Sequence, residues 1–257
     1  MASMRCNVFS EVLGLSTSMT VILPQSTRGQ IGMTGRGSAV GAPVLYLLHG
    51  LSDDDTIWSR RTSVERYAAE KGLAVVMPRV ERSFYSDEVH GGAYWTFLSQ
   101  ELPAIVGELF RVSDAREDTF VAGLSMGGYG ALQWALREPS RFAAAASLSG
   151  VLDIASFAEQ DVEGGVFRRV FGDAPVRGSD SDLLALLERS DPASLPALYL
   201  ACGDGDELLE SNRTFLAAAE AAGVPVDVTF DEGAHEWGYW DRHIQRVLDW
   251  LPIRPRD

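Results

Sequence analysis

Short apolar runs alternate along this chain with longer segments in which apolar residues recur every three or four positions. Runs of this length, many of them ending at Gly or Pro, predict β-strands, and the continuous run at 44–48 is typical of a parallel strand buried on both faces. The predicted strands are residues 5–9, 19–23, 44–48, 73–77, 120–124, 142–148, 198–202 and 224–230.

The helical periodicity lies between these strands. It covers residues 61–72, 94–111, a segment that ends before Pro139, 208–222 and 236–251. Alternating strands and helices predict an α/β fold with a mostly parallel central sheet, helices on both faces and an antiparallel N-terminal pair of strands. We expect one domain over residues 1–257, in which the short helical segments 166–171 and 182–189 place a small helical cap within residues 151–190.

A glycine-rich stretch at residues 28–42 separates the second and third predicted strands. A phosphate-binding loop would be followed by G-K-[ST] and a helix, and neither follows here. We interpret the stretch as a mobile hairpin loop.

The net charge of the chain indicates which kinds of binding partner are unfavourable. A net charge of −14 argues against nucleic acid or an anionic membrane as a partner. No apolar run is long enough to span a membrane, and residues 1–10 lack the pattern of a signal peptide, so we expect a cytoplasmic protein. Cys6 and Cys202 are interpreted as buried, reduced thiols. The sequence leaves homo-oligomerisation open.

The most informative motif is Gly123-Leu-Ser125-Met-Gly127, which joins a predicted strand to a predicted helix. Such a turn holds its serine in strained backbone geometry, and side chains two residues away on either side would collide with the strand and the helix. Gly128 and Gly130 would let the helix lie close to its strand. The alternative is a tight turn whose serine merely caps the helix.

A serine nucleophile needs a base and an acid, expected after later strands and in the order serine, acid, histidine. Of the histidines, only His235 and His243 follow Ser125; His243 lies within the last predicted helix and is interpreted as an ordinary helix residue. His235 directly follows the 224–230 strand and is the candidate base. Asp204 and Asp206 both follow the preceding strand, and spacing alone does not decide between them.

An oxyanion hole would complete the site. One donor is expected from the backbone N–H of Met126, directly after the serine, and the second from the N–H of Leu51, after the strand that ends at His49-Gly50. His49 is interpreted as a residue that shapes this loop, since it precedes the serine in the chain.

Four motifs together resemble the esterase D family of α/β-hydrolases, which includes S-formylglutathione hydrolases and antigen-85-type mycolyltransferases. They are Tyr46-Leu-Leu-His-Gly-Leu-Ser-Asp, Gly123-Leu-Ser-Met-Gly-Gly-Tyr-Gly-Ala, Cys202-Gly-Asp-Gly-Asp-Glu-Leu and Gly233-Ala-His-Glu-Trp-Gly-Tyr-Trp240. The chain is most similar to the bacterial tributyrin/acetyl-esterase branch; the likeness runs from about residue 7 to 251 and is poor over 151–190.

The resemblance implies an α/β-hydrolase fold with Ser125 as nucleophile, His235 as base, Asp206 as acid, and Leu51 and Met126 as oxyanion donors. It favours Asp206 over Asp204, because the family motif places the acid at the fifth residue of the Cys202-Gly segment.

The sequence and the resemblance together predict a serine ester hydrolase that acts on small-molecule esters with short acyl chains, without a cofactor or metal. The alternatives are an S-formylglutathione hydrolase, a mycolyl-type acyltransferase and a non-catalytic binding protein.

Three residues are candidates for the wall of the substrate pocket: His49, Trp58 and Phe167. Core packing is the alternative interpretation of Trp58 and Phe167. The acidic run Asp53–Asp55 would either repel anionic acyl groups or form a solvated loop.

Overall fold

The central feature of the fold is a single twisted sheet. In a computed structural model, which describes residues 1–29, 31, 35–37, 41–161 and 165–254, the strands follow the order β1-β2-β4-β3-β5-β6-β7-β8. The pairs from β4 to β8 are parallel, whereas β1 pairs antiparallel with β2, and β2 with β4. The predicted α/β fold is therefore confirmed. The strands are β1 Ala2–Ser10, β2 Leu15–Leu23, β3 Val44–Leu48, β4 Ala74–Pro78, β5 Thr119–Leu124, β6 Ala144–Leu148, β7 Ala197–Gly203 and β8 Val226–Asp231.

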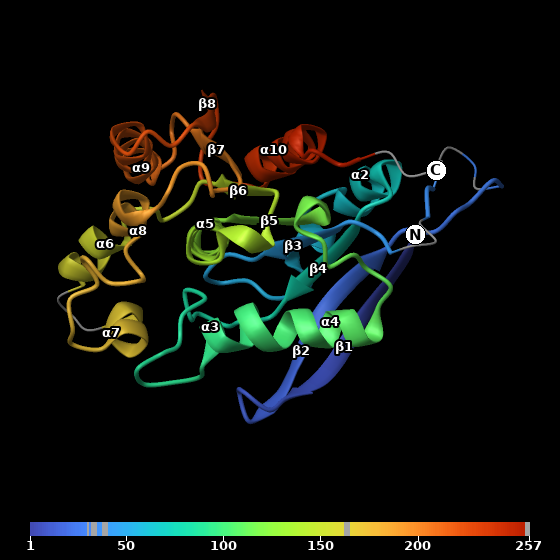
Figure 1. The fold of residues 1–257 in the computed structure, drawn as a ribbon, viewed down its shortest axis with the longest axis horizontal. Coiled ribbons are helices and arrows are strands. Elements are labelled where there is room, and N and C mark those ends of the chain that lie inside the picture. The colour runs from blue at the N-terminus through green and yellow to red at the C-terminus, as the bar shows by residue number, and fades with distance from the viewer. Residues whose placement is uncertain (30, 32–34, 38–40, 162–164, 255–257) are drawn as a thin grey trace.

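Helices cover both faces of the sheet (Figure 1). The α1, α2 and α10 helices pack against one face, and the other face is covered by α4, α5, α8 and α9, with α3 continuing into α4. The helices are α1 Ile57–Arg61, α2 Val64–Lys71, α3 Tyr94–Thr96, α4 Leu102–Leu109, α5 Met126–Arg137, α6 Ile154–Gln160, α7 Val166–Phe171, α8 Leu183–Arg189, α9 Leu209–Ala221 and α10 Trp237–Trp250.

The sheet separates two hydrophobic cores, one on each face, and each parallel strand contributes side chains to both. In β3, Tyr46 and Leu48 pack into the core beneath α5, while Leu45 and Leu47 pack into the core beneath α10. Because successive side chains point to opposite faces, a strand covered on both sides needs apolar residues at every position. This explains the continuous run at 44–48.

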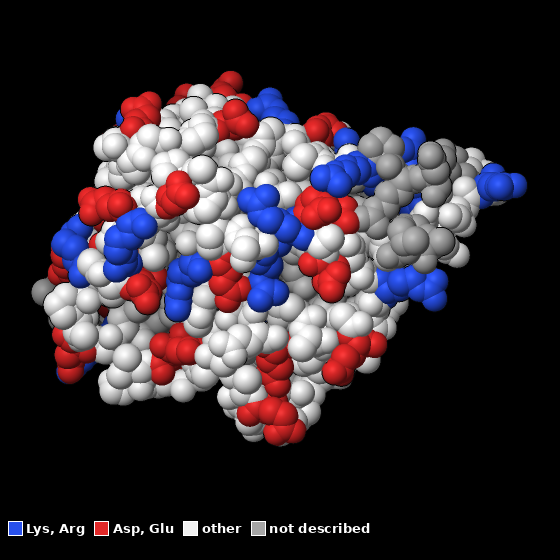
Figure 2. All heavy atoms as spheres, viewed as in Figure 1, with Lys and Arg blue, Asp and Glu red and all other residues white. Residues whose placement is uncertain are grey.

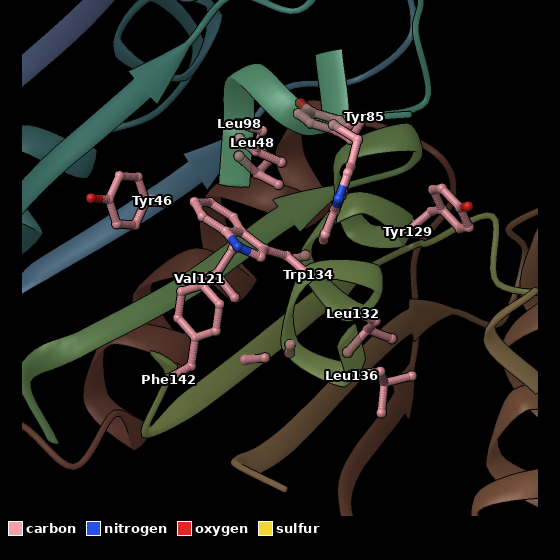
Figure 3. Packing of buried hydrophobic residues seen from close by; sticks show 14 of the residues in the cluster. Tyr46, Leu48, Tyr85, Leu98, Val121, Tyr129, Leu132, Trp134, Leu136 and Phe142 are labelled. Carbon is pink, nitrogen blue, oxygen red and sulfur yellow. The ribbon is translucent and has the colours of Figure 1, made fainter. Parts of the chain in front are cut away.

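The α5 helix lies near the middle of the molecule (Figure 1), and its Trp134 packs among buried aromatic residues (Figure 3). The Trp134 indole lies between two aromatic rings, with its centroid 5.1 Å from that of Tyr46 and 5.0 Å from that of Phe142. Aromatic contacts of this kind stabilise a core beyond the area they bury. They fix α5, and with it the turn at its N-terminus, against β3 and β6.

The helix predicted over 94–111 is present over 94–109 but changes its hydrogen-bond pattern part of the way along. Residues Phe97–Glu101 form a π-helical stretch between α3 and α4. Pro103 has no N–H to donate to the carbonyl of Ser99, and its ring would collide with that carbonyl in a regular helix. The Ser99 carbonyl instead accepts a hydrogen bond from Arg141 Nη2 at 3.1 Å. The predicted helix is therefore confirmed over residues 94–109, with a local π-helical stretch where Pro103 removes one regular hydrogen bond.

The α6, α7 and α8 helices follow β6 and gather at one end of the sheet (left in Figure 1). They occupy most of residues 151–190, although α8 also packs its buried leucines into the core beside α5. The α6 helix was not predicted. The single domain with a cap stays a prediction, and so does the mobile hairpin over 28–42, of which residues 30, 32–34 and 38–40 lie outside the described residues.

The surface of the protein bears on the predictions about its charge and about membrane-spanning segments. Acidic and basic side chains are interspersed over the face seen in Figure 2. In the described part of the chain, no helix has both the length and the apolar character needed to cross a bilayer.

Both cysteines are free, and Cys202 is buried as predicted, but Cys6 is only partly buried.

The acidic run Asp53–Asp55 is not uniformly solvated. The Asp55 side chain is fully buried and accepts hydrogen bonds from Arg5 and from the hydroxyls of Ser18 and Thr20. Asp54 accepts from the backbone N–H and the hydroxyl of Thr56, at the start of α1. The solvated-loop interpretation is therefore wrong for Asp55, whose carboxylate ties the β1–β2 hairpin to the loop after β3.

We predict that Asp55→Ala lowers the free energy of unfolding by about 2–3 kcal/mol, mainly because it leaves the buried Ser18 and Thr20 hydroxyls without their acceptor. Urea denaturation measures the change. The control is Asp180→Ala, whose carboxylate is 71% exposed and pairs with Arg189 at 3.2 Å; its loss should cost less than about 1 kcal/mol. Equal losses in the two variants would contradict the prediction.

Candidate active site

Ser125 lies at the turn between β5 and α5, in a backbone conformation that few residues other than glycine adopt. Its φ is 52° and its ψ −118°. The Ser125 N–H donates to the Leu148 carbonyl at 2.9 Å, and its carbonyl accepts from Tyr129 N at 3.1 Å. The Ser125 side chain makes no capping hydrogen bond to α5. The alternative in which this serine merely caps a helix is therefore wrong, and the strain fits a turn kept for function.

The flanking glycines explain why the turn is so sharp. A Cβ on Gly123 would lie 2.2 Å from the carbonyl oxygen of Gly127. A Cβ on Gly127 would lie 2.4 Å from the Leu48 carbonyl oxygen and 2.7 Å from that of His49. The collision of Gly123 with the helix was predicted, whereas that of Gly127 is with the neighbouring strand rather than the one that leads into the turn. The turn therefore packs directly on the end of β3.

The next two glycines in α5 make room for other neighbours. A Cβ on Gly128 would meet the Ser147 hydroxyl of β6 at 2.4 Å, and one on Gly130 would meet the Tyr85 ring at 2.4 Å. The predicted close approach is therefore present, but it is made mainly to β6 and Tyr85 rather than to the helix's own strand.

His235 and Asp206 are brought together by the loops after β8 and β7. The His235 Nδ1 lies 3.0 Å and 3.1 Å from the two carboxylate oxygens of Asp206. A carboxylate only accepts, so Nδ1 carries the proton and Nε2 is left as an acceptor. Asp204, the alternative from the sequence, is exposed and instead accepts from the Gly233 N–H at 3.4 Å.

The Asp206 carboxylate is held in its charged form by hydrogen bonds. Its side chain is fully buried, and burial raises the pKa of the carboxyl. Hydrogen bonds from His235, from the Leu208 backbone N–H and from the Ser149 hydroxyl outweigh burial, so the net pKa shift is downward. A charged Asp206 can orient the imidazole and stabilise its protonated form.

The loop after β3 lies beside Ser125. A Cβ placed on Gly50 would be 3.8 Å from the Cβ of Ser125 and 2.8 Å from Asp53 Oδ2. Leu51 follows in this loop and is half-buried, and Met126 is buried at the first position of α5. The two predicted oxyanion donors therefore belong to segments that adjoin Ser125.

His49 is buried and shapes this loop through both ring nitrogens. Its Nδ1 lies 2.7 Å from the Gly50 carbonyl oxygen, and its Nε2 accepts from the Val80 N–H at 3.2 Å. Burial lowers the pKa of His49, so the ring is the neutral tautomer with its proton on Nδ1. The Tyr85 hydroxyl donates to the His49 carbonyl at 2.9 Å.

The other two residues predicted for the pocket wall lie within aromatic clusters. Trp58 is 1% exposed, donates from Nε1 to the Leu48 carbonyl at 3.0 Å and packs edge-on against Trp237. Phe167 stacks on Phe84, with 5.0 Å between the ring centroids. Their place in the pocket stays a prediction.

A hollow of about 330 Å³ opens beside the loop after β3. Its wall is polar and carries three acidic and three basic side chains. It is lined by Leu51, Ser52, Asp53, Asp54, Arg60, Arg79, Glu81 and Arg82. Burial raises the pKa of Asp53, the carboxyl closest to Gly50.

Sequence reasoning missed three residues that support this site: Tyr85, Ser149 and Trp240. Ser149 directly follows β6, so the rule that sites form after parallel strands could have found it. Tyr85 and Trp240 act through side-chain contacts with residues distant in the chain, and no local pattern marks them.

Known proteins are similar to this chain over nearly its whole length. The Esterase family matches residues 10–251. An acetyl esterase of Caldicellulosiruptor saccharolyticus is 32% identical over 262 residues, which cover 98% of this chain and 98% of the relative.

Two solved structures from Staphylococcus aureus are similar to this one. The substrate-bound fluorophosphonate-binding serine hydrolase FphF has a TM-score of 0.89 at 32% identity, covering 98% of this chain and 99% of that chain. The S-formylglutathione hydrolase FrmB has a TM-score of 0.85 at 32% identity, covering 98% of each chain.

The remaining histidine after Ser125, His243, gives a prediction about stability. It is fully buried in α10, its Nε2 lies 3.1 Å from Asp231 Oδ1, and burial lowers its pKa to about 4. The unfolded chain, with a histidine pKa near 6.5, binds this proton more readily, so the stability contributed above pH 6.5 is lost as the pH falls toward 4. Burial also lowers the pKa of His49, so this residue too contributes stability that is lost as the pH falls.

We therefore expect His243→Gln to flatten the fall in unfolding free energy between pH 6.5 and 4.5, by on the order of 2 kcal/mol. Urea denaturation at several pH values measures the slope. The exposed His90 provides the control, because His90→Gln should keep the wild-type slope. A His243→Gln profile parallel to that of the wild type would contradict this account.

Proposed function

Since the chain belongs to the Esterase family and is a serine carboxylesterase, we propose that Ser125 is its nucleophile, His235 its general base and Asp206 the acid that orients the base. The observation that carries the proposal is the hydrogen-bonded pair of His235 and Asp206. The pair lies at the same edge of the sheet as the turn after β5, in which Ser125 has a strained backbone conformation. The order serine, acid, histidine along the chain also agrees with this fold.

The reaction proceeds through an acyl-enzyme. Ser125 Oγ attacks the ester carbonyl carbon while its proton passes to His235 Nε2, and the carbonyl oxygen takes up negative charge. The bond from carbon to the alcohol oxygen then breaks, and His235 returns the proton to that oxygen. In the second half a water molecule attacks the acyl group, His235 accepts its proton, and Ser125 recovers a proton as the carboxylic acid leaves.

The backbone N–H groups of Leu51 and Met126 are proposed to stabilise the oxyanion. Their support is the packing of Gly127 on the end of β3 and of Gly50 beside Ser125, which fixes the two segments relative to each other. Donors held in place before the reaction need no reorganisation when charge develops, and each is typically worth 10²–10³-fold in turnover.

The substrate is proposed to be a small ester with a short acyl chain. The name of the acetyl esterase relative supports this class. The polar wall of the hollow beside Leu51 supports it too, because a long alkyl chain would gain little free energy against charged side chains. The cytoplasmic location and a homo-oligomer stay predictions.

A thioesterase acting on S-formylglutathione is the second candidate. Its support is the similarity to FrmB over nearly the whole of both chains. Both reactions use the same nucleophile, base and oxyanion donors, so the residues proposed here do not discriminate between them. The choice of substrate has to come from the pocket.

We predict that Ser125→Ala lowers kcat/KM for p-nitrophenyl acetate by about 10⁵-fold or more, because the remaining groups of a triad contribute little without the nucleophile. Mass spectrometry of the wild type inhibited with an alkyl phosphonate should place the label on the peptide that carries Ser125. The exposed Ser194 is the matched control, and Ser194→Ala should keep the wild-type rate. Turnover by Ser125→Ala within tenfold of the wild type would disprove the assignment.

A panel of p-nitrophenyl esters tests the acyl preference. We expect kcat/KM to be highest for acetate or butyrate and to fall at least about tenfold by laurate, because the polar hollow does not stabilise a long chain. S-formylglutathione is measured beside the panel. A value for this thioester about 100-fold above that for acetate would identify a thioesterase, and a maximum at laurate would contradict the short-chain proposal.

A further inference from the structure

His235 lies just outside α10, and its ring packs against a residue of that helix. Glu236, the residue before α10, has an extended backbone with a φ of −147° and a ψ of 156°. The His235 ring meets the Trp240 ring edge to face, with 4.8 Å between centroids and 86° between planes. The two residues are five positions apart, so the contact does not come from the helical repeat of three or four residues. It depends on the turn of the chain at Glu236.

The hydrogen bond to Asp206 fixes only part of the position of the imidazole. His235 Nδ1 lies 3.0 Å and 3.1 Å from the two carboxylate oxygens, so neither oxygen alone sets the direction of the bond. The ring can tilt about the line from Nδ1 to the carboxylate without breaking this contact. A tilt moves Nε2, the atom proposed to exchange a proton with Ser125. A second contact is therefore needed to hold the plane of the ring.

Trp240 supplies a second contact, and its own ring is held in place. The side chain is 5% exposed, and its Nε1 donates to the Ser149 hydroxyl at 3.1 Å. The Trp237 ring packs against it edge to face, with 5.1 Å between centroids. An indole that is held both through its N–H and through a ring contact presents a rigid surface to the imidazole.

The aromatic contacts continue from Trp240 to the end of β3. Trp237 packs edge to face against Trp58, with 5.5 Å between centroids, and Trp58 Nε1 donates to the Leu48 carbonyl at 3.0 Å. Leu48 is the last residue of β3. The row of three tryptophans therefore joins the end of β3 to the ring of His235. It holds the proposed base at a fixed place relative to the loop after β3.

We propose that Trp240 is a positioning residue for His235: its ring holds the plane of the imidazole so that Nε2 is directed to Ser125. The proposal rests on the proposed function of His235. Trp240 contributes no group to the reaction, because its one polar side-chain atom donates to Ser149. Loss of its ring should therefore slow the steps in which His235 transfers a proton.

The test is Trp240→Leu, which keeps an apolar side chain and removes the flat ring. We expect kcat/KM for p-nitrophenyl acetate to fall by about tenfold to hundredfold, because a displacement of about 1 Å at a catalytic group costs on the order of 100-fold. Rates are expressed per active site, titrated with an alkyl phosphonate, so that inactive protein does not lower them.

A second substrate distinguishes positioning from a general loss of structure. Ethyl acetate forms the same acyl-enzyme, but its ethoxide needs a proton from His235 in order to leave, whereas p-nitrophenolate leaves as a stable anion. In Trp240→Leu, kcat/KM for ethyl acetate should therefore fall about tenfold further than that for p-nitrophenyl acetate. Equal losses on the two esters would overturn the proposal.

Trp250→Leu is the matched control. Trp250 is the half-buried last residue of the same helix, and its Nε1 donates to Asp227 at 2.7 Å. Its ring packs on Tyr199, with 5.3 Å between centroids. The variant removes an indole of α10 that packs on a different ring, so it should keep the wild-type rates on both esters. A shift in the ratio of the two rates equal to that of Trp240→Leu would overturn the proposal.

Trp240→Phe retains a ring beside the imidazole but loses the donor to Ser149. Its ratio of rates on the two esters should lie between those of the wild type and Trp240→Leu. If Trp240→Leu does not fold, Trp240→Phe decides the question. A shift of about threefold in the ratio, the size expected for loss of one hydrogen bond, supports the proposal, and an unchanged ratio overturns it.

The comparison that separates this proposal from the proposed function uses His235→Ala as the background. If Trp240 acts through His235, adding Trp240→Leu should change the residual kcat/KM of His235→Ala by less than about threefold. An undiminished loss in that background would overturn the proposal. So would wild-type kinetics of both Trp240 variants beside a strongly impaired His235→Ala, an outcome that leaves the proposed function intact. Full activity of His235→Ala would overturn both.

Discussion

The structure of the site depends on one close contact, the approach of the turn after β5 to the end of β3. Neither Gly123 nor Gly127 has space for a Cβ, since the first would meet the backbone of the second and the second would meet the carbonyls of Leu48 and His49. This contact forces the positive φ of Ser125 and at the same time sets the distance to the loop that carries Leu51. The proposed nucleophile and the proposed oxyanion donors are therefore positioned by the same backbone packing. Strain at Ser125 persists because Trp134 and the two cores hold α5 in place.

Hydrogen bonds around the charged groups complete this arrangement. A buried carboxylate is stable only if its oxygens are occupied, and Asp206 obtains its partners from three different segments of the chain. Each segment follows a strand or begins after one, because the carboxyl ends of neighbouring parallel strands lie at a common edge. The sheet order β3-β5-β6-β7-β8 thus translates directly into a row of loops that carry Leu51, Ser125, Ser149, Asp206 and His235.

Much of this could be predicted from the sequence, because the relevant signals are local. Continuous apolar runs mark parallel strands, and a glycine two residues on each side of a serine marks the turn. The choice between Asp204 and Asp206 could not be made from spacing, since it depends on which side chain the backbone turns toward His235. Likewise, Asp53, Asp54 and Asp55 are three copies of one residue type, yet their carboxylates lie beside Gly50, at the start of α1 and, buried, in an ion pair with the half-exposed Arg5. The burial and the hydrogen-bond partners of such a side chain depend on residues distant in the chain that the fold places beside it.

The same reasoning explains why substrate choice is harder to derive than the reaction. The proposed catalytic groups are fixed by the sheet and its turns, which any member of the fold must build in the same way. The substrate pocket is proposed to lie at other segments, among them those that line the charged hollow beside Leu51. In the helices between β6 and β7, Phe167 of α7 stacks on Phe84 of the loop after β4. An acetyl esterase and an S-formylglutathione hydrolase can therefore both resemble this chain over nearly its whole length. Discrimination between ester and thioester has to arise outside the groups proposed to carry out the reaction, because both reactions would use the same nucleophile, base and oxyanion donors.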